Sequence, residues 1–99
     1  MSVYFMANIR ICDEQQYNQY LELVDSVFSG YNGTYLAVDN NPCILEGKWD
    51  YTKVVLIHFP SESDFRKWYE SEEYQEIIAF RLSGAQCDTL LVHGNKNKA

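Results

Sequence analysis

The chain has 99 residues, of which 46% are hydrophobic, and this length and composition fit a single compact domain. Eight basic residues stand against 14 acidic ones, and the net charge of -6 argues against nucleic acid and anionic membrane partners, which need a basic face. Apolar runs such as 54–57 are far shorter than the roughly 20 residues of a membrane span. We therefore expect a cytoplasmic protein with neither nucleic acid nor membrane as a partner. The domain should cover 1–94, followed by a polar, disordered tail at 95–99.

The first predicted elements are a strand and a helix. Apolar side chains alternate along residues 3–11, the pattern of a strand with one buried face. Asp13 and Gln16 have the spacing of a helix capping box. An apolar stripe then recurs at intervals of three and four residues and stops before Gly30 or Gly33, which predicts one amphipathic helix. The stripe consists of Tyr17, Tyr20, Leu21, Val24, Val27 and Phe28.

Three short strands are predicted in the middle of the chain. The first covers 35–38 and is followed by a turn at 39–42, which is rich in Asp, Asn and Pro. The second covers 43–49, with Gly47 as a bulge. The third covers 53–59 and is apolar on both faces, apart from a histidine near its end.

Two serines are predicted to cap the remaining helical segments. Ser61 begins one segment, and Ser71 begins a second that ends at Gly84. A last strand is expected over 89–93. The order β-α-β-β-β-α-β predicts an α+β fold, a ferredoxin-like βαββαβ sandwich with one extra hairpin strand. The apolar stripe of the second helical segment is expected to contain Tyr74, Ile77, Ile78 and Leu82.

The predicted sheet has more apolar surface than two helices can cover. Helices on one side of an antiparallel sheet leave the other side to water, and that side should then be polar. Val54 and Leu56 form one apolar row of the 53–59 strand, opposite a second apolar row. Tyr4 and Met6 likewise lie opposite the buried row of the first strand. We therefore predict a homodimer in which a second copy of the sheet packs on this face.

Four blocks of the chain resemble a known family. They are 4–11 (YFMANIRI), 45–50 (LEGKWD), 59–61 (FPS) and 68–75 (WYESEEYQ), with Arg81 following. In this order they are similar to the domain-of-unknown-function family thirteen-thirty, in the dimeric α/β-barrel superfamily. The resemblance implies a dimeric α/β barrel with a cleft between each sheet and its helices. Related superfamily members include cofactor-independent monooxygenases, lactone isomerases and haem-degrading proteins.

Two positions depart from these relatives. Family members commonly carry an acidic residue where this chain has His58, so a role for a carboxylate there is not expected. Haem-degrading relatives combine an Asn on the first strand with a Trp and a His on the second helix. Asn8 and Trp68 match the first two, but 61–84 contains no histidine. The resemblance therefore does not extend to haem degradation.

Three polar candidates for ligand binding lie on predicted strands. Asn8 and Arg10 share the face of the first strand that also carries Tyr4 and Met6. Buried polar groups need partners, and a carboxylate such as Glu46, reached across the dimer, is one possibility. The alternative is that Asn8 and Arg10 present an amide and a cation to an anionic or carbonyl-bearing ligand.

The second group of candidates lies near the predicted second helix. Arg81 is the cation best placed by the resemblance to meet a ligand, although a helical cation also pairs or reaches solvent. Trp68 and Tyr74, with Trp49 and Tyr69, are expected to line the cleft between helices and sheet. Such rings suit a flat aromatic ligand, and they equally suit an apolar core.

No motif indicates a metal or a cofactor, and we expect neither. His58 and His93 end strands that should lie two strand spacings apart, which could admit a shared ligand only if both faced the same way. The sequence thus predicts a small dimeric protein that binds an aromatic or carbonyl-bearing molecule. The resemblance implies that its activity, if it has one, is monooxygenase- or isomerase-like and needs no cofactor. The alternative is a non-catalytic structural or interaction dimer.

Overall fold

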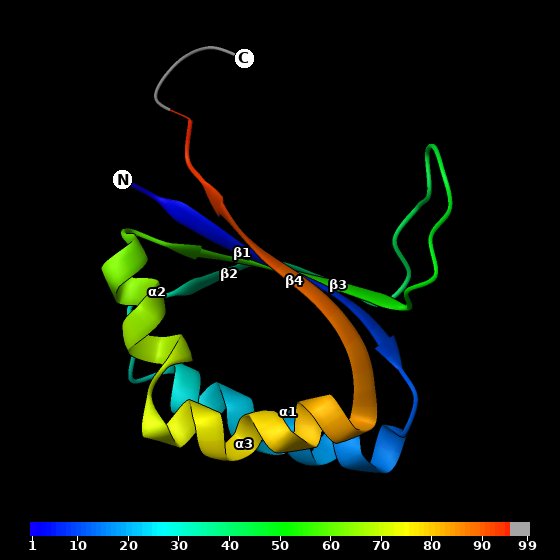
Figure 1. Cartoon of the computed structure of the whole chain (residues 1–99), viewed down its shortest axis with the longest axis horizontal. Helices are drawn as coiled ribbons and strands as arrows, with labels where there is room; N and C mark the ends of the chain where they lie inside the picture. Colours follow the sequence, from blue (N-terminus) through cyan, green and yellow to red (C-terminus); the bar gives the residue numbers. More distant parts are fainter. Residues whose placement is uncertain (96–99) are drawn as a thin grey trace.

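The computed structural model describes residues 1–95, which form one four-stranded sheet with three helices on one side (Figure 1). The strand order is β2-β3-β1-β4, and every neighbouring pair is antiparallel. This arrangement confirms the predicted ferredoxin-like α+β fold. The elements in chain order are β1 (Val3–Ile11), α1 (Glu14–Phe28), β2 (Thr34–Asp39), β3 (Lys53–Phe59), α2 (Glu62–Tyr69), α3 (Glu72–Gly84) and β4 (Ala85–His93).

The core lies between the sheet and the helices. Alternate residues of β1 face the helices and are buried, whereas their neighbours point to the opposite side of the sheet. Trp68 of α2 is 1% exposed and packs against Phe59 and Phe28 at ring-centroid distances of 5.6 and 5.5 Å. A large share of the aromatic residues therefore builds a single cluster on the helical side.

The predicted helix starts are confirmed at all three helices. The side chain of Asp13 accepts a hydrogen bond from the backbone N–H of Gln16 at 3.2 Å. Ser61 and Ser71 each accept one from the N–H three residues on, both at 3.1 Å. Each cap satisfies a backbone donor that has no partner within the helix.

The buried face of α3 differs by one position from the prediction. Leu82 is 59% exposed, and Arg81 takes the buried place instead. Gly84 explains why α3 is rotated about its axis relative to the prediction. Its Cα lies against the backbone of Tyr17 in α1, and its carbonyl accepts hydrogen bonds from the N–H groups of Cys12 and Asp13. The helix must turn this glycine toward α1, and Arg81, one turn earlier, then faces the sheet.

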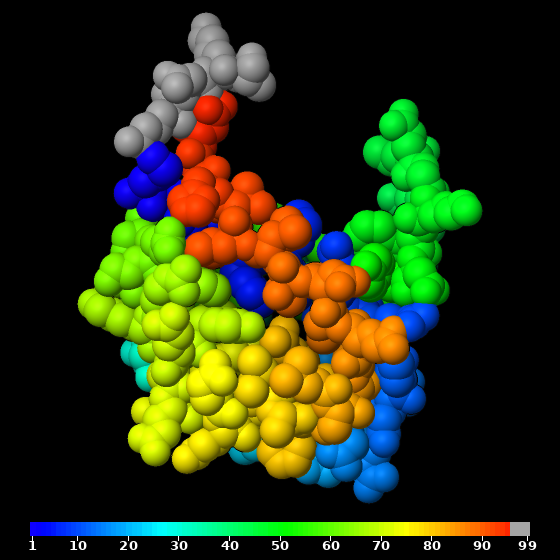
Figure 2. Space-filling model, in the orientation of Figure 1, coloured from blue at the N-terminus to red at the C-terminus, as the bar shows by residue number. Residues whose placement is uncertain are grey.

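The predicted strand over 43–49 is wrong. Residues 40–52 form a loop, here called the arm, which stands away from the sheet on the side opposite the helices (Figures 1 and 2). The arm pairs with none of the four strands, and Gly47 adopts a φ of 85° rather than forming a bulge within a strand. The apolar side chains of the arm are exposed, with Leu45 88% accessible.

The side of the sheet without helices, here called the open face, carries many apolar side chains. Register places Tyr4, Met6 and Leu56 on this face, together with Leu90 and Val92 of β4. Leu90 and Val92 are 53% and 42% exposed. Figure 2 shows this side hollowed between the arm and the end of β4.

The described part of the chain contains no helix that is both long and apolar enough to cross a membrane. Of the predicted polar tail, only Asn95 belongs to the described residues, and 96–99 lie outside them.

Candidate functional site

A cavity of about 490 Å³ lies between the sheet and the helices. Its floor is the helix-facing row of β1 and β3, and its other walls come from α1, β2, α2 and α3. Predominantly apolar walls with a few polar groups are typical of small-molecule sites. The residues around it are Phe5, Ala7, Ile9, Tyr17, Tyr20, Leu21, Val24, Asp25, Tyr35, Val38, Lys53, Val55, Ile57, Trp68 and Arg81.

Two buried cations belong to this cavity. Arg81 is 4% exposed and Lys53 is 6% exposed. Among residues 1–95, neither forms an ion pair with a carboxylate, and Nε of Arg81 has no hydrogen-bond partner. Burial lowers the pKa of Lys53 because it disfavours the charged ammonium. Burial acts on Arg81 in the same sense, but nearby Tyr74 and Tyr20 offset it and raise its pKa, so Arg81 stays cationic.

Tyr17 lies beside both cations. The Nζ atom of Lys53 is 5.0 Å from the centroid of the Tyr17 ring, a cation–π distance. Burial raises the pKa of the Tyr17 phenol to about 12, while the charge of Arg81 acts to lower it. The phenol is therefore neutral at physiological pH. At the rim, the exposed Asp25 is the one carboxylate among the residues around the cavity.

The aromatic wall includes an unsatisfied donor. The Nε1 atom of Trp68 is buried and has no hydrogen-bond partner within the described residues. Tyr74 packs against this ring at a centroid distance of 4.2 Å and shares a buried hydrogen bond of 2.8 Å with the hydroxyl of Tyr20. The Nε of Arg81 and the Nε1 of Trp68 are thus two donors at the cavity without acceptors.

The structure separates the predicted site residues into two groups. Trp68 and Arg81 belong to the cavity wall, and Tyr74 stands directly behind Trp68. Asn8 and Arg10 lie on the open face, on the other side of the sheet. They therefore do not meet the other candidates in one site.

Glu46 lies on the arm, beside a second, outer hollow formed by arm residues and Val54. Within the chain Arg10 donates to Asp50 at 2.5 Å, and the suggested pairing with Glu46 across a dimer stays a prediction. Trp49 is also on the arm, where its ring contacts Tyr51, so its expected place at the cleft is wrong. Glu46 and Trp49 both lie away from the cavity because residues 40–52 form a loop and not a strand of the sheet.

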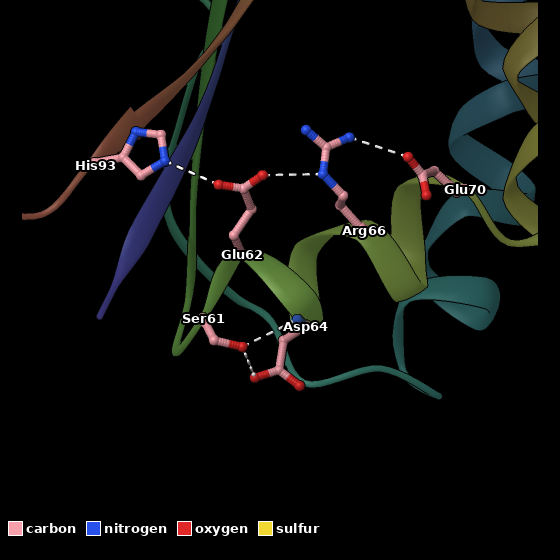
Figure 3. A network of polar contacts seen from close by, with 6 residues as sticks. All are labelled: Ser61, Glu62, Asp64, Arg66, Glu70 and His93. Atoms are coloured by element: carbon pink, nitrogen blue, oxygen red, sulfur yellow. Dashed lines mark hydrogen bonds and ion pairs between the residues drawn. The ribbon is translucent and has the colours of Figure 1, made fainter.

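The two histidines face opposite sides of the sheet, so they are not placed to bind one ligand together. His58 lies opposite Tyr4 on the open face and contacts Ser2 Oγ at 2.9 Å. His93 lies opposite Val3 and reaches Glu62 of α2 at 2.9 Å (Figure 3). Within residues 1–95 no three His, Cys, Asp or Glu side chains are placed to hold a metal ion.

Figure 3 shows that Glu62 is held from both sides. Arg66 donates to its second carboxylate oxygen at 3.0 Å and also pairs with Glu70 at 3.0 Å. The hydrogen bond from His93, and then that from Arg66, lowers the pKa of Glu62. This exposed network ties the end of β4 to α2, and it explains the position of His93 without a ligand.

Sequence reasoning missed Lys53 and Tyr17 as site residues. Lys53 begins the helix-facing row of β3, with Val55 and Ile57, and a cation in an otherwise apolar row was the available signal. Tyr17 was recognised only as part of an apolar stripe. Its place beneath Lys53 depends on how α1 crosses the sheet, which no local pattern encodes.

The fold and the cavity define the class: a ferredoxin-like α+β domain with a partly polar chamber between helices and sheet. The chain belongs to the family described as Domain of unknown function (DUF1330), whose profile matches residues 2–95. No curated protein matches the sequence.

Solved structures share the fold at low sequence identity. A protein of unknown function from Rhodopseudomonas palustris is 16% identical with a TM-score of 0.75, covering 97% of this chain and 84% of its own. A dimeric ferredoxin-like protein of unknown function from Jannaschia sp. is 10% identical with a TM-score of 0.78, covering 95% and 100%. SnoaB, a cofactor-independent oxygenase from Streptomyces nogalater, is 10% identical with a TM-score of 0.68, covering 97% and 95%. These similarities concern the fold.

Proposed function

We propose that this protein is a homodimer that binds a small aromatic or carbonyl-bearing molecule in the cavity between its helices and sheet. The observation that carries the proposal is the cavity itself, about 490 Å³, with aromatic walls and two donors that lack acceptors. A folded protein of this size rarely leaves buried donors unpaired, because each costs about 1–3 kcal/mol. A ligand that brings acceptors and a flat apolar body would satisfy both features.

The proposed chemistry is a reaction without a cofactor, of monooxygenase or isomerase type. The similarity in fold to a cofactor-independent oxygenase supports this class. In such a reaction Arg81 would stabilise negative charge that develops on the ligand, while Trp68 and its neighbours hold the ring in place. The location that we propose is the cytoplasm, with which the three free cysteines are compatible.

Ligand binding can be followed through Trp68. The chain has two tryptophans, so Trp49→Phe leaves Trp68 at the cavity as the sole tryptophan fluorophore. Small aromatic acids and quinones are titrated, and a binder should change the Trp68 emission. It should also raise the melting temperature, since a ligand at about 100 times its Kd adds about 2.7 kcal/mol.

A filled cavity provides the control. Ala7 is buried in the cavity floor, and Ala7→Leu should abolish both signals, whereas Ala79→Leu on the exposed side of α3 should leave them unchanged. If no member of the panel changes the emission or the melting temperature, the result favours the alternative, a non-catalytic interaction dimer.

The proposed dimer joins the open faces of two sheets. Three observations support it: the apolar side chains of that face, the buried Oδ1 of Asn8 without a partner among the described residues, and a similar structure described as dimeric. Leu56→Arg places a charge on this face and should give a monomer in sedimentation, whereas Leu82→Arg on exposed α3 should remain dimeric. A wild-type monomer at micromolar concentration would contradict the dimer.

A further inference from the structure

We propose that the cavity takes an anionic ligand, a planar aromatic acid whose charged group is held by Arg81 and Lys53. The inference rests on the proposed function and adds the charge of the ligand. It also assigns a binding role to Lys53, which the resemblance to the family did not indicate.

Burying the charges of Arg81 and Lys53 costs free energy. A buried charge is tolerated when an opposite charge or a set of hydrogen bonds compensates it. Arg10 and Arg66 illustrate the usual outcome, because both are paired with carboxylates at the surface. Arg81 and Lys53 are the buried charged residues of the described chain, and neither is paired. The natural place for their counter-charge is the cavity that both of them border.

The polar groups around the cavity have the right character for an anion. Arg81 and Trp68 contribute nitrogen donors without acceptors, and Lys53 contributes an ammonium above the ring of Tyr17. The neutral phenol of Tyr17 can also donate. The exposed carboxylate of Asp25 lies at the rim, so it does not neutralise the two cations in the interior.

The negative net charge of the chain makes the two buried cations in the cavity the local site on which binding of an anion would depend. At -6 the protein repels anions at long range, so binding of an anion depends on a local site that water and salt do not screen. Two cations inside an apolar cavity form such a site. The remaining walls, rich in aromatic and aliphatic side chains, fit the flat apolar part of the same molecule.

Two dyes test the charge directly. 8-Anilinonaphthalene-1-sulfonate and N-phenyl-1-naphthylamine share one ring system, and only the first carries a sulfonate. Both fluoresce in apolar sites, so their Kd values can be measured with the same full-length protein, and Ala7→Leu reports whether each dye occupies the cavity. We expect the sulfonate to bind at least about tenfold more tightly than the neutral dye, the value of one charge-assisted hydrogen bond.

Variants then assign the effect to the two cations. Arg81→Met and Lys53→Met should each raise the Kd of the sulfonate dye about tenfold or more, and they should change the Kd of the neutral dye less than about twofold. Arg66→Met, at an exposed and paired cation, is the matched control and should change neither dye.

Stability separates a binding role from a structural one. Without ligand, Arg81→Met and Lys53→Met should each melt at the same temperature as the wild type or higher, because each removes an unpaired buried charge. A structural cation would instead lower the melting temperature when replaced.

Each outcome decides the question. The proposal of an anionic ligand would be overturned by equal affinity of the wild type for both dyes, or by an equal loss of affinity for the neutral dye in the two variants. Either result would still leave the cavity as a binding site. If neither dye binds in the cavity, both this inference and the proposed function fail.

Discussion

The contact between Gly84 and α1 allows a sharp prediction, because it connects stability with the site. A Cβ built on Gly84 would lie 2.5 Å from the backbone nitrogen of Tyr17, which is 0.9 Å short of the 3.4 Å where ordinary van der Waals contact begins. It would also lie 2.9 Å from the Cα of Tyr17 and 3.0 Å from the carbonyl oxygen of Asp13. Since these are backbone atoms, no side-chain rotation relieves the overlap, and α1 and α3 must separate.

We expect Gly84→Ala to lower the free energy of unfolding by about 1–3 kcal/mol, the usual cost of overpacking. The higher helix propensity of alanine would offset at most about 1 kcal/mol of this near the end of α3. In urea denaturation at a fixed protein concentration, the urea concentration at the midpoint should fall. In thermal unfolding, the melting temperature should drop by roughly 4–8 °C for each kcal/mol lost. Because Tyr17 moves with α1, dye binding in the cavity should weaken as well.

Gly30→Ala is the control, since its nearest neighbouring atom would lie at 3.6 Å and no shift is required. We expect its stability to remain within about 0.5 kcal/mol of the wild type. If Gly84→Ala is as stable as Gly30→Ala, the close packing of α1 on α3 is wrong, and with it the reason that Arg81 faces the sheet.

Two further predictions concern buried tyrosines. Tyr20→Phe and Tyr74→Phe should each lower the free energy of unfolding by about 1–2 kcal/mol, because each leaves the other hydroxyl without its hydrogen-bond partner. The double variant should lose less than the sum of the two single losses. Additive losses would refute the hydrogen bond between the two hydroxyls. Burial is the largest cause that raises the pKa values of Tyr17, Tyr20 and Tyr74. Because the folded state keeps these phenols protonated, their contribution to the free energy of unfolding is fully present below pH 10, the usual pKa of tyrosine. It is lost as the pH rises through their folded-state pKa values. Phenolate absorbance should therefore show these three ionising only above pH 10, with or after unfolding; titration of all eight tyrosines near pH 10 in a folded protein would contradict this.

The sequence by itself determined the local elements of this protein. Strand alternation in 3–11 and 53–59, and the caps at Asp13, Ser61 and Ser71, depend on residues that are close in the chain. The excess of apolar residues on the open face was also visible, because alternation assigns each side chain to one side of a strand.

Only the tertiary structure decided where the site lies. Apolar residues in 43–49 resemble a strand, but a strand needs a backbone partner, and in the folded chain the arm pairs with none of the four strands. Lys53 and Arg81 share one cavity because α3, held against α1 at Gly84, turns Arg81 toward the sheet that carries Lys53. Such a meeting of distant residues depends on the packing of helices on a sheet, and the spacing of residues along the chain carries no record of it.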